Sequence, residues 1–222
     1  MAHLHEILAS EVSSWRKKSY SGHDFTVLGE ILDWAKKPDG SGFVLRPPQI
    51  KALETYWYLR LLLKTPNVFD LYKSALHNKS ELLKALGVPP QAFELVDYDD
   101  NELWRRIKED SGFARQFRLE ALRETLTLDY ASYILALAMG AGKTALIGAI
   151  IATEFGLAIE YPDGPFVQNA LVFAPGLTII ESLRELAEVP YHRILPQRLY
   201  KPFAASLKLT FTREGDPDIP II

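Results

Sequence analysis

Cysteine is absent from the 222-residue sequence. Disulfide frameworks, zinc sites with thiolate ligands and cysteine nucleophiles are therefore excluded, and the absence agrees with a cytoplasmic protein. An excess of charge of one sign is missing too, because 25 lysines and arginines face 28 aspartates and glutamates, for a net charge of −3. This balance argues against a protein that coats nucleic acid through its overall charge, although it leaves a local basic patch open. Apolar residues make up 48% of the chain, which is enough for a hydrophobic core.

A membrane-targeting segment is also not expected. The first ten residues lack a basic start followed by an apolar block, so they do not resemble a signal peptide. Residues 130–152 are long and apolar enough for a membrane span and contain one charge, Lys143. That charge lies in mid-span beside Gly140 and Gly142, where insertion into a bilayer is costly. A buried strand, a glycine turn and a buried helix explain the same residues better, so we expect no membrane association.

Residues 1–128 are predicted to be helical. Apolar residues recur there at three- and four-residue spacings, and proline or glycine separates the periodic stretches. The predicted helices cover residues 25–37, 49–64, 68–77, 80–86, 101–108 and 113–126. Aromatic residues at these spacings, such as Trp57 and Trp104, are expected to pack in the core rather than to form a ligand site.

The pattern changes after residue 128. Short apolar runs at residues 133–138, 170–174 and 207–211 predict buried strands, and residues 143–155 and 179–188 predict helices between them. Alternation of strand and helix is typical of βαβ units, which form a parallel sheet with right-handed crossovers. The predicted fold class is therefore α/β, with a helical N-terminal region followed by the start of a parallel sheet.

A glycine-rich turn provides the strongest functional signal. Residues 138–144 read AMGAGKT and lie between a predicted strand and a predicted helix. In a phosphate-binding loop, glycines let backbone N–H groups point at phosphate oxygens, and the helix that follows presents its positive N-terminal end. Lys143 would contact the β- and γ-phosphates, and the Thr144 hydroxyl would bind Mg²⁺. Leu137 stands where the full motif has its first glycine, and the alternative is a structural turn with a surface lysine.

Three segments together resemble the motifs of superfamily 2 helicases and translocases, in the order of that family. Residues 137–144 (LAMGAGKT) resemble motif I, and residues 170–178 (ALVFAPGLT) resemble motif Ia. Residues 45–49 (LRPPQ) resemble the Q-type motif that reads adenine. The resemblance is greatest to the DEAD/DEAH-type helicases that are grouped with type III restriction subunits.

This resemblance implies a domain organisation and a function. Residues 129–222 would be part of a RecA-like P-loop lobe, and residues 1–128 a helical region with an insertion at residues 66–126. The implied function is binding of ATP and Mg²⁺ as the first motor lobe of an ATP-dependent nucleic-acid helicase or translocase, with DNA favoured over RNA. The implied nucleotide-binding residues are Arg46, Gln49, Met139, Gly140, Ala141, Gly142, Lys143 and Thr144. Lys143 and Thr144 are also the implied catalytic residues, and Thr144 is the implied Mg²⁺ ligand. Nucleic-acid backbone contacts are implied for Pro175, Gly176 and Thr178.

Gln49 has a physical reason to bind adenine apart from the resemblance. A side-chain amide carries an acceptor and two donors, so it can pair with adenine N6 and N7 together. Arg46 would lie over the base or hold Gln49 in place, and the alternatives are a glutamine at a helix start and a surface arginine. However, 94 positions separate Gln49 from Lys143, and an insertion of that size can displace the glutamine from the nucleotide pocket.

The groups that hydrolyse ATP are not recognisable in the sequence. Phosphoryl transfer of this kind needs a carboxylate that holds Mg²⁺ and a residue that orients the attacking water. No D-E-x-H segment follows residue 178, and the acidic clusters at residues 97–100 and 216–218 do not end an apolar strand. We therefore expect the amino-terminal part of a larger protein with a second motor lobe, which binds ATP but does not hydrolyse it alone. The alternatives are a P-loop phosphotransferase and a nucleotide-binding module that never hydrolyses ATP.

The segment between Glu188 and Glu214 has no acidic residue. Basic residues interleaved with aromatic ones would suit a path for single-stranded nucleic acid, in which charges follow phosphates and rings stack on bases. The alternative is a solvated loop with packed aromatic residues, and the nearly neutral overall charge favours it. The basic residues are Arg193, Arg198, Lys201, Lys208 and Arg213, and the aromatic ones are Tyr191, His192, Tyr200 and Phe203.

Overall fold

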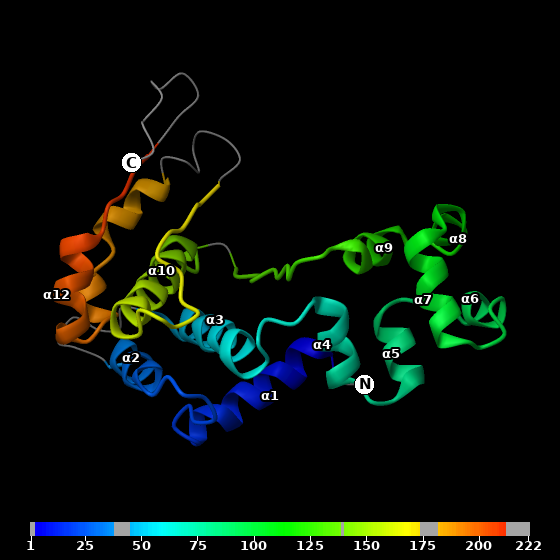
Figure 1. Ribbon diagram of the computed structural model, residues 1–222, viewed down its shortest axis with the longest axis horizontal. Coiled ribbons are helices and arrows are strands. Elements are labelled where there is room, and N and C mark those ends of the chain that lie inside the picture. The colour runs from blue at the N-terminus through cyan, green and yellow to red at the C-terminus, as the bar shows by residue number, and fades with distance from the viewer. Residues whose placement is uncertain (1–2, 38–44, 139, 174–181, 212–222) are drawn as a thin grey trace. The chain divides into compact units, whose positions relative to one another are not determined.

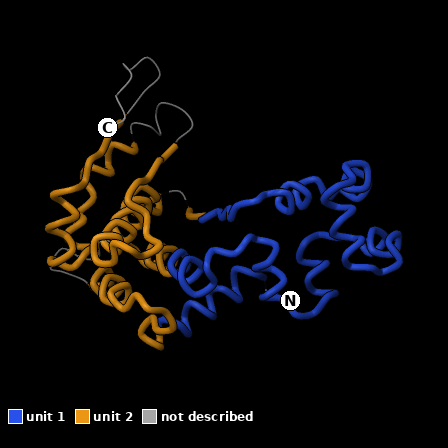
Figure 2. Tube along the Cα trace, viewed as in Figure 1, with its two compact units in different colours: residues 1–16, 55–135 blue, residues 17–54, 136–222 orange. Residues whose placement is uncertain are grey.

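The computed structural model describes residues 3–37, 45–138, 140–173 and 182–211. The chain forms two compact units (Figure 2). Unit 1 contains residues 1–16 and 55–135, and unit 2 contains residues 17–54 and 136–222. Residues 17–54 therefore group with the C-terminal part of the chain, although they precede the expected domain boundary at residue 128.

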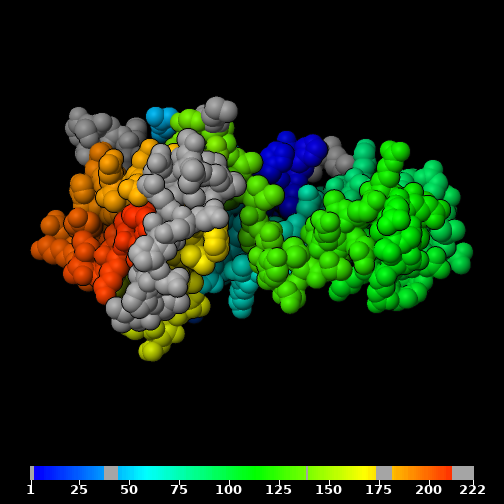
Figure 3. All heavy atoms as spheres, turned by 90° about the horizontal axis from the view of Figure 1, so that it is seen from above, coloured from blue at the N-terminus to red at the C-terminus, as the bar shows by residue number. Residues whose placement is uncertain are grey.

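Unit 1 consists of helices, and short connections join those that follow residue 57 (Figure 1). In chain order they are α1 (Leu4–Lys17), the π-helix η1 (Tyr58–Leu62), α4 (Val68–Ala75), α5 (Lys79–Ala85), α6 (Pro90–Glu94), α7 (Asp100–Glu109), α8 (Ser111–Gln116) and α9 (Glu120–Thr127). The atoms of α5 to α9 gather into one continuous mass, coloured teal to green in Figure 3.

Asparagine and aspartate side chains begin four of these helices. In each case the side-chain oxygen accepts a hydrogen bond from a backbone N–H of the first turn, at 2.9 to 3.2 Å. These N–H groups have no partner inside the helix, so a capping side chain stabilises the helix start. The capping residues are Asn67 of α4, Asn78 of α5, Asp99 of α7 and Asp110 of α8.

The core of unit 1 lies around α7. Leu103 and Ile107, about one turn apart on this helix, are both 0% exposed. They belong to a cluster of buried apolar residues that also includes Ala92 of α6 and Phe113 of α8. Helix α7 contacts α6, α8 and α9. Helices α6, α8 and α9 are therefore held by burial of their apolar faces against α7, because helices of this length are marginal on their own.

Unit 2 is arranged around α10 (Lys143–Glu160) (Figure 1). This helix packs against α2 (Val27–Ala35), α12 (Gln197–Ser206) and the 3₁₀ turns η2 (Arg184–Glu188) and η3 (Tyr191–Arg193). Helix α3 (Pro47–Trp57) belongs to unit 2 up to residue 54. Buried residues occur on every side of α10, as its apolar sequence predicts. They are Leu146, Gly148, Ala149, Ala152, Thr153, Glu154, Gly156, Leu157 and Ala158.

Arg198 of α12 links three helices of unit 2. Its Nη2 atom lies 2.5 Å from Glu30 Oε2 of α2, and its Nη1 atom lies 2.7 Å from Glu160 Oε2 of α10. The hydrogen bond with Glu30 is the largest cause of the raised pKa of this guanidinium. A planar guanidinium holds two carboxylates in a fixed geometry, so Arg198 orients α12 against α2 and α10.

No strand is present among the described residues, so the predicted α/β fold with a parallel sheet is wrong. Residues 133–138, 170–173 and 207–211 form neither a helix nor a strand in the described part of the chain. Their apolar side chains include Ile134, Leu171 and Phe173, which are 92%, 80% and 84% exposed. An extended segment becomes a strand only when a partner satisfies its backbone N–H and C=O groups. A short apolar run shows hydrophobicity but does not identify such a partner.

The helices were predicted more accurately than the strands. Their expected bounds before residue 128 agree with α2, α4, α5, α7 and the combined span of α3 and η1 to within a few residues. The expected helix at residues 113–126 is divided into α8 and α9, with Arg118 between them in the left-handed region at φ 57°. Helices α1, α6 and α12 were not predicted. The expected helix at residues 179–188 is represented by η2, and residues 179–181 lie outside the described part.

The apolar segment at residues 130–152 supplies the first half of α10. Within the part of the chain that the structure describes, no helix has both the length and the hydrophobicity that a membrane span needs.

Leu103→Ala tests the core of unit 1. The substitution removes a fully buried side chain and leaves a cavity beside α6 and α8, a change that typically costs about 2–5 kcal/mol. We expect the free energy of unfolding in urea, followed by circular dichroism, to fall by about that amount. Leu95→Ala is the matched control because Leu95 is 53% exposed, and it should change the free energy by less than about 0.5 kcal/mol. Equal losses in the two variants would contradict the core that the structure shows.

Candidate phosphate-binding site

The glycine turn lies at the start of α10. Gly140 and Gly142 both have positive φ angles, 73° and 74°. Gly142 is the N-cap residue of α10, in the left-handed conformation with ψ 54°. Glycine adopts this conformation without the steric cost that a Cβ imposes. Both glycines are exposed, so the turn lies on the surface of unit 2.

The N-terminal end of α10 is open. Its N-cap residue, Gly142, has no side chain that could cap the first N–H groups, unlike the Asn and Asp residues that begin α4, α5, α7 and α8. The first N–H groups of a helix have no partner inside the helix, and together with the helix dipole they attract an anion. The first helical hydrogen bond runs from Leu146 N to Gly142 O at 3.3 Å, which leaves the N–H groups of Lys143 and Thr144 without a partner inside the helix. The start of α10 therefore presents backbone donors of the kind that bind anions at helix N-termini.

Lys143 and Thr144 occupy the first two positions of α10. Lys143 is exposed, and its Nζ atom donates a hydrogen bond to Ala138 O at 3.4 Å. The ammonium group therefore folds back over the glycine turn. Thr144 is half-buried. The two side chains that the sequence assigned to phosphate and Mg²⁺ thus stand in the first turn of α10, and their roles stay predictions.

Gln49 of α3 contacts the glycine turn directly. Its Nε2 donates a hydrogen bond to Gly142 O at 2.6 Å, and its Oε1 accepts one from Arg46 N at 2.6 Å. The side chain is buried, with 2% of its surface exposed. The helical insertion between the two segments therefore does not separate Gln49 from the turn. The expectation that Gln49 reads adenine stays a prediction, and the hydrogen bonds place its amide against the backbone of the turn.

Arg46 reaches the other glycine of the turn. Its Nη1 atom donates a hydrogen bond to Gly140 O at 3.0 Å. This contact brings a second positive charge beside the one on Lys143. Residues 45–49 and 140–144 therefore form a single site in unit 2, although 94 positions separate Arg46 from Gly140. The remaining predicted residues, Met139, Pro175, Gly176 and Thr178, lie outside the described residues.

A buried acid on α3 was not predicted from the sequence. Glu54 is 0% exposed, and its Oε1 accepts a hydrogen bond from Tyr20 OH at 2.6 Å. Lys36 Nζ donates to the same Tyr20 oxygen at 2.5 Å. These contacts anchor α3 at a point beyond Gln49, so the helix that carries Gln49 is held by polar contacts at two places. A single glutamate on a helix has no sequence pattern that distinguishes it from a surface residue.

The basic segment after residue 188 is largely engaged in packing. Tyr191 and Phe203 are 7% and 1% exposed, and their ring centroids lie 5.1 Å apart. The Tyr191 hydroxyl donates to Leu186 O at 2.7 Å, and burial raises the pKa of this hydroxyl. Arg198 is bound to Glu30 and Glu160, as described above. These contacts match the alternative of packed aromatic residues rather than rings open to bases.

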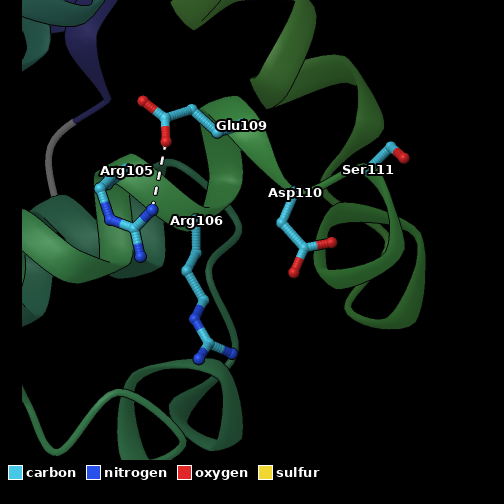
Figure 4. A pocket seen from close by; sticks show the side chains of 5 residues that line it. All are labelled: Arg105, Arg106, Glu109, Asp110 and Ser111. Atoms are coloured by element: carbon cyan, nitrogen blue, oxygen red, sulfur yellow. Dashed lines mark hydrogen bonds and ion pairs between the residues drawn. The ribbon is translucent and has the colours of Figure 1, made fainter.

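A pocket of about 500 Å³ lies on α7 and the start of α8 in unit 1 (Figure 4). Its charged side chains hold one another. Arg105 binds Glu109 at 3.2 Å and Glu102 at 2.7 Å, and Asp110 caps α8. The hydrogen bond with Arg105, joined by one with Arg106, lowers the pKa of the Glu102 carboxyl to about 2. These exposed ion pairs support the helices, and the pocket lacks the convergent unpaired groups of a ligand site.

The comparisons identify no relative of this chain. The sequence matches no protein-family model, no curated protein and no solved structure. Among the described residues, no three His, Cys, Asp or Glu side chains gather into a group that could hold a metal ion. The functional assignment therefore depends on the geometry of the glycine turn.

Substitution of the two glycines by alanine tests this geometry. An added Cβ would lie 2.5 Å from Gln49 Nε2 at Gly142 but would meet nothing within 4 Å at Gly140. Gly140→Ala should therefore cost only the backbone strain, about 1–2 kcal/mol, whereas Gly142→Ala should cost more in urea unfolding. Gln49→Ala should relieve the added cost, so that Gly142→Ala in that background resembles Gly140→Ala. An additional cost of Gly142→Ala that persists in the Gln49→Ala background would contradict the contact.

Proposed function

We propose that this chain binds a nucleoside triphosphate, with its phosphates at the glycine turn before α10. The observation that carries the proposal is the open N-terminal end of α10, which begins at a left-handed glycine and has no capping side chain. The backbone N–H groups of the first turn would donate to phosphate oxygens, and the helix dipole adds to this attraction. Arg46 and Lys143 supply positive charge at the same turn. The alternative of a purely structural glycine turn does not require two cationic side chains there.

ATP with Mg²⁺ is the ligand that we propose. The residues at the turn fit this group, because glycines leave room for phosphate and Lys143 provides a compact charge for the β- and γ-phosphates. Thr144 would offer its hydroxyl to the metal ion. Mg²⁺ is usually held by substrate phosphates together with few protein ligands and several waters, so a single hydroxyl at this position is a reasonable contribution from the protein.

We further propose that the nucleotide site belongs to an ATP-dependent helicase or translocase that acts on nucleic acid, DNA rather than RNA. The support is the order of three motif-like segments in the sequence, at residues 45–49, 137–144 and 170–178. The contacts of Arg46 and Gln49 with the turn add to this support, since they bring the first two segments together.

Lys143→Ala should abolish binding of Mg²⁺-ATP, or weaken it at least tenfold, as measured by isothermal titration calorimetry. The substitution removes a charge that contacts phosphate directly, and hydrogen bonds to charged groups contribute about 1.5–3 kcal/mol. The side chain is exposed, so the helix content in circular dichroism should not change. Lys84→Ala is the matched control, because Lys84 is an exposed lysine of α5 in unit 1. Wild-type affinity in the Lys143→Ala variant would show that the turn is not the phosphate site.

Adding single-stranded DNA to the same titration tests the proposal that the chain belongs to a helicase or translocase. In a nucleic-acid translocase the binding of nucleotide and of nucleic acid is coupled, and this coupling is reciprocal. The affinity for Mg²⁺-ATP should therefore change when DNA is present. Identical affinities with and without DNA would favour a phosphotransferase or a nucleotide-binding module over a motor.

Thr144→Ala should lower the affinity for Mg²⁺-ATP more than it lowers the affinity for ATP in the presence of a chelator. The physical reason is that the hydroxyl contacts the metal ion rather than the phosphates. Thr144→Ser, which keeps the hydroxyl, should restore the difference between the two conditions. Calorimetric titrations with Mg²⁺ and with EDTA measure both affinities. Equal losses in the two conditions would contradict a role of Thr144 at the metal.

A further inference from the structure

We propose that Gln49 is a positioning residue that holds the glycine turn in its phosphate-binding shape, and that it acts on any triphosphate regardless of the base. This inference rests on the proposed function, because it concerns the same turn. It differs from the adenine-reading role, in which the amide would contact the base and not the protein backbone.

The two hydrogen bonds of Gln49 fix the orientation of its amide. Arg46 N is a donor, so it must face the Gln49 oxygen, and Gly142 O is an acceptor, so it must face the Gln49 nitrogen. A rotated amide would place donor against donor and acceptor against acceptor. The contact with Arg46 N is the same one that a glutamine three residues after an N-cap makes in a capping box. Gln49 therefore caps α3 with its oxygen and holds the turn with its nitrogen.

The contact with Gly142 determines the direction of a backbone N–H group. A peptide unit is planar and trans, so its C=O and the N–H of the next residue point in opposite directions. Holding the Gly142 carbonyl therefore aims the Lys143 N–H away from Gln49, out of the start of α10. The same carbonyl accepts the first helical hydrogen bond, from Leu146 N. Gln49 thus stabilises both the first turn of α10 and an N–H group that would face phosphate.

Arg46 holds the turn at its other glycine. Its guanidinium donates to Gly140 O at 3.0 Å, so the carbonyls of Gly140 and Gly142 are both bound by side chains from residues 46–49. Carbonyl oxygens carry partial negative charge and would repel phosphate if they turned toward it. The two contacts keep these oxygens engaged, which leaves the N–H groups and the Lys143 ammonium group for the anion.

Burial separates this role from recognition of a base. Gln49 has 2% of its surface exposed, and its amide is engaged on both sides by protein backbone. Its contribution therefore reaches the ligand through the shape of the turn, and the turn faces phosphates, which are common to ATP, GTP and inorganic tripolyphosphate. Loss of the hydrogen bonds of Gln49, which clamp the turn, should weaken the binding of all three ligands by a similar factor.

The experiment compares Gln49→Glu and Gln49→Met with the wild-type chain. Gln49→Glu keeps the acceptor that caps α3 but loses the donor to Gly142 O. Gln49→Met keeps the approximate shape without adding charge, so it separates the lost donor from a charge effect. Calorimetric titrations with the Mg²⁺ complexes of ATP, GTP and tripolyphosphate give the affinities. Gln91→Glu, at an exposed glutamine of α6, is the matched control. Amide hydrogen exchange at Leu146, without ligand, reports the start of α10 independently.

We expect both Gln49 variants to bind all three ligands about five- to tenfold more weakly than the wild type. We also expect faster exchange of the Leu146 amide in both variants, with the Gln91→Glu control unchanged. A loss confined to ATP would identify a base-reading glutamine and overturn the inference. Unchanged affinities for all three ligands would overturn it as well. If the wild-type chain bound none of the three while exchange still quickened, the proposed function would fail, but the clamp on the turn would be supported.

Discussion

The apolar surface on every side of α10 is the constraint on which unit 2 depends. A helix of this kind is stable in water only when several other elements cover it, and here α2, α12, η2 and η3 do so. These elements come from distant parts of the sequence, on both sides of α10. The start of the helix is different, because Gly140, Gly142 and Lys143 are exposed. Burial of the body therefore holds α10 in place while its N-terminal end stays accessible to an anion.

Buried polar groups on α3 fix where this helix lies within unit 2. Gln49 and Glu54 are 2% and 0% exposed, and burial of such groups is costly unless hydrogen bonds compensate for the lost water. The Gly142 carbonyl and the Tyr20 hydroxyl provide partners for them. Hydrophobic contacts alone allow a helix to slide or rotate at modest cost, whereas these hydrogen bonds are satisfied in only one placement. The position of Arg46 beside Gly140 follows from the same placement, since it directly precedes α3.

Local signals in the sequence predicted several helices and the glycine turn, although α1, α6 and α12 were missed. Pro47 marks the start of α3, and the pair Gly142 and Lys143 marks the start of α10, because each residue type imposes its own backbone preference. The prediction of a sheet was wrong because the apolar runs at residues 133–138 and 170–173 do not specify what they pack against. Long-range polar contacts could not be predicted either, because a residue's neighbours in the sequence do not indicate its distant partner. Nothing near Arg198 in the sequence points to Glu30, 168 positions away.

At the site, the sequence grouped Arg46 and Gln49 with the glycine turn through a resemblance, but it did not predict how they contact the turn. The motif order placed Arg46 and Gln49 with residues 140–144, and their hydrogen bonds to Gly140 and Gly142 agree with that grouping. The atoms involved depend on the fold, because the same amide can face a base or a backbone carbonyl equally well. Tyr20 and Glu54 were missed because their pairing links two segments that share no motif.

The close approach of Gln49 to Gly142 has an evolutionary consequence. An added Cβ at position 142 would lie 2.5 Å from the Gln49 nitrogen, so a side chain there requires Gln49 to shift or to be replaced by a smaller residue. The reverse dependence is weaker, because the φ of 74° favours glycine at position 142 even beside a smaller neighbour. Drift at this pair should therefore be asymmetric: position 49 can vary while the glycine remains, whereas a change at position 142 costs less once position 49 has become smaller.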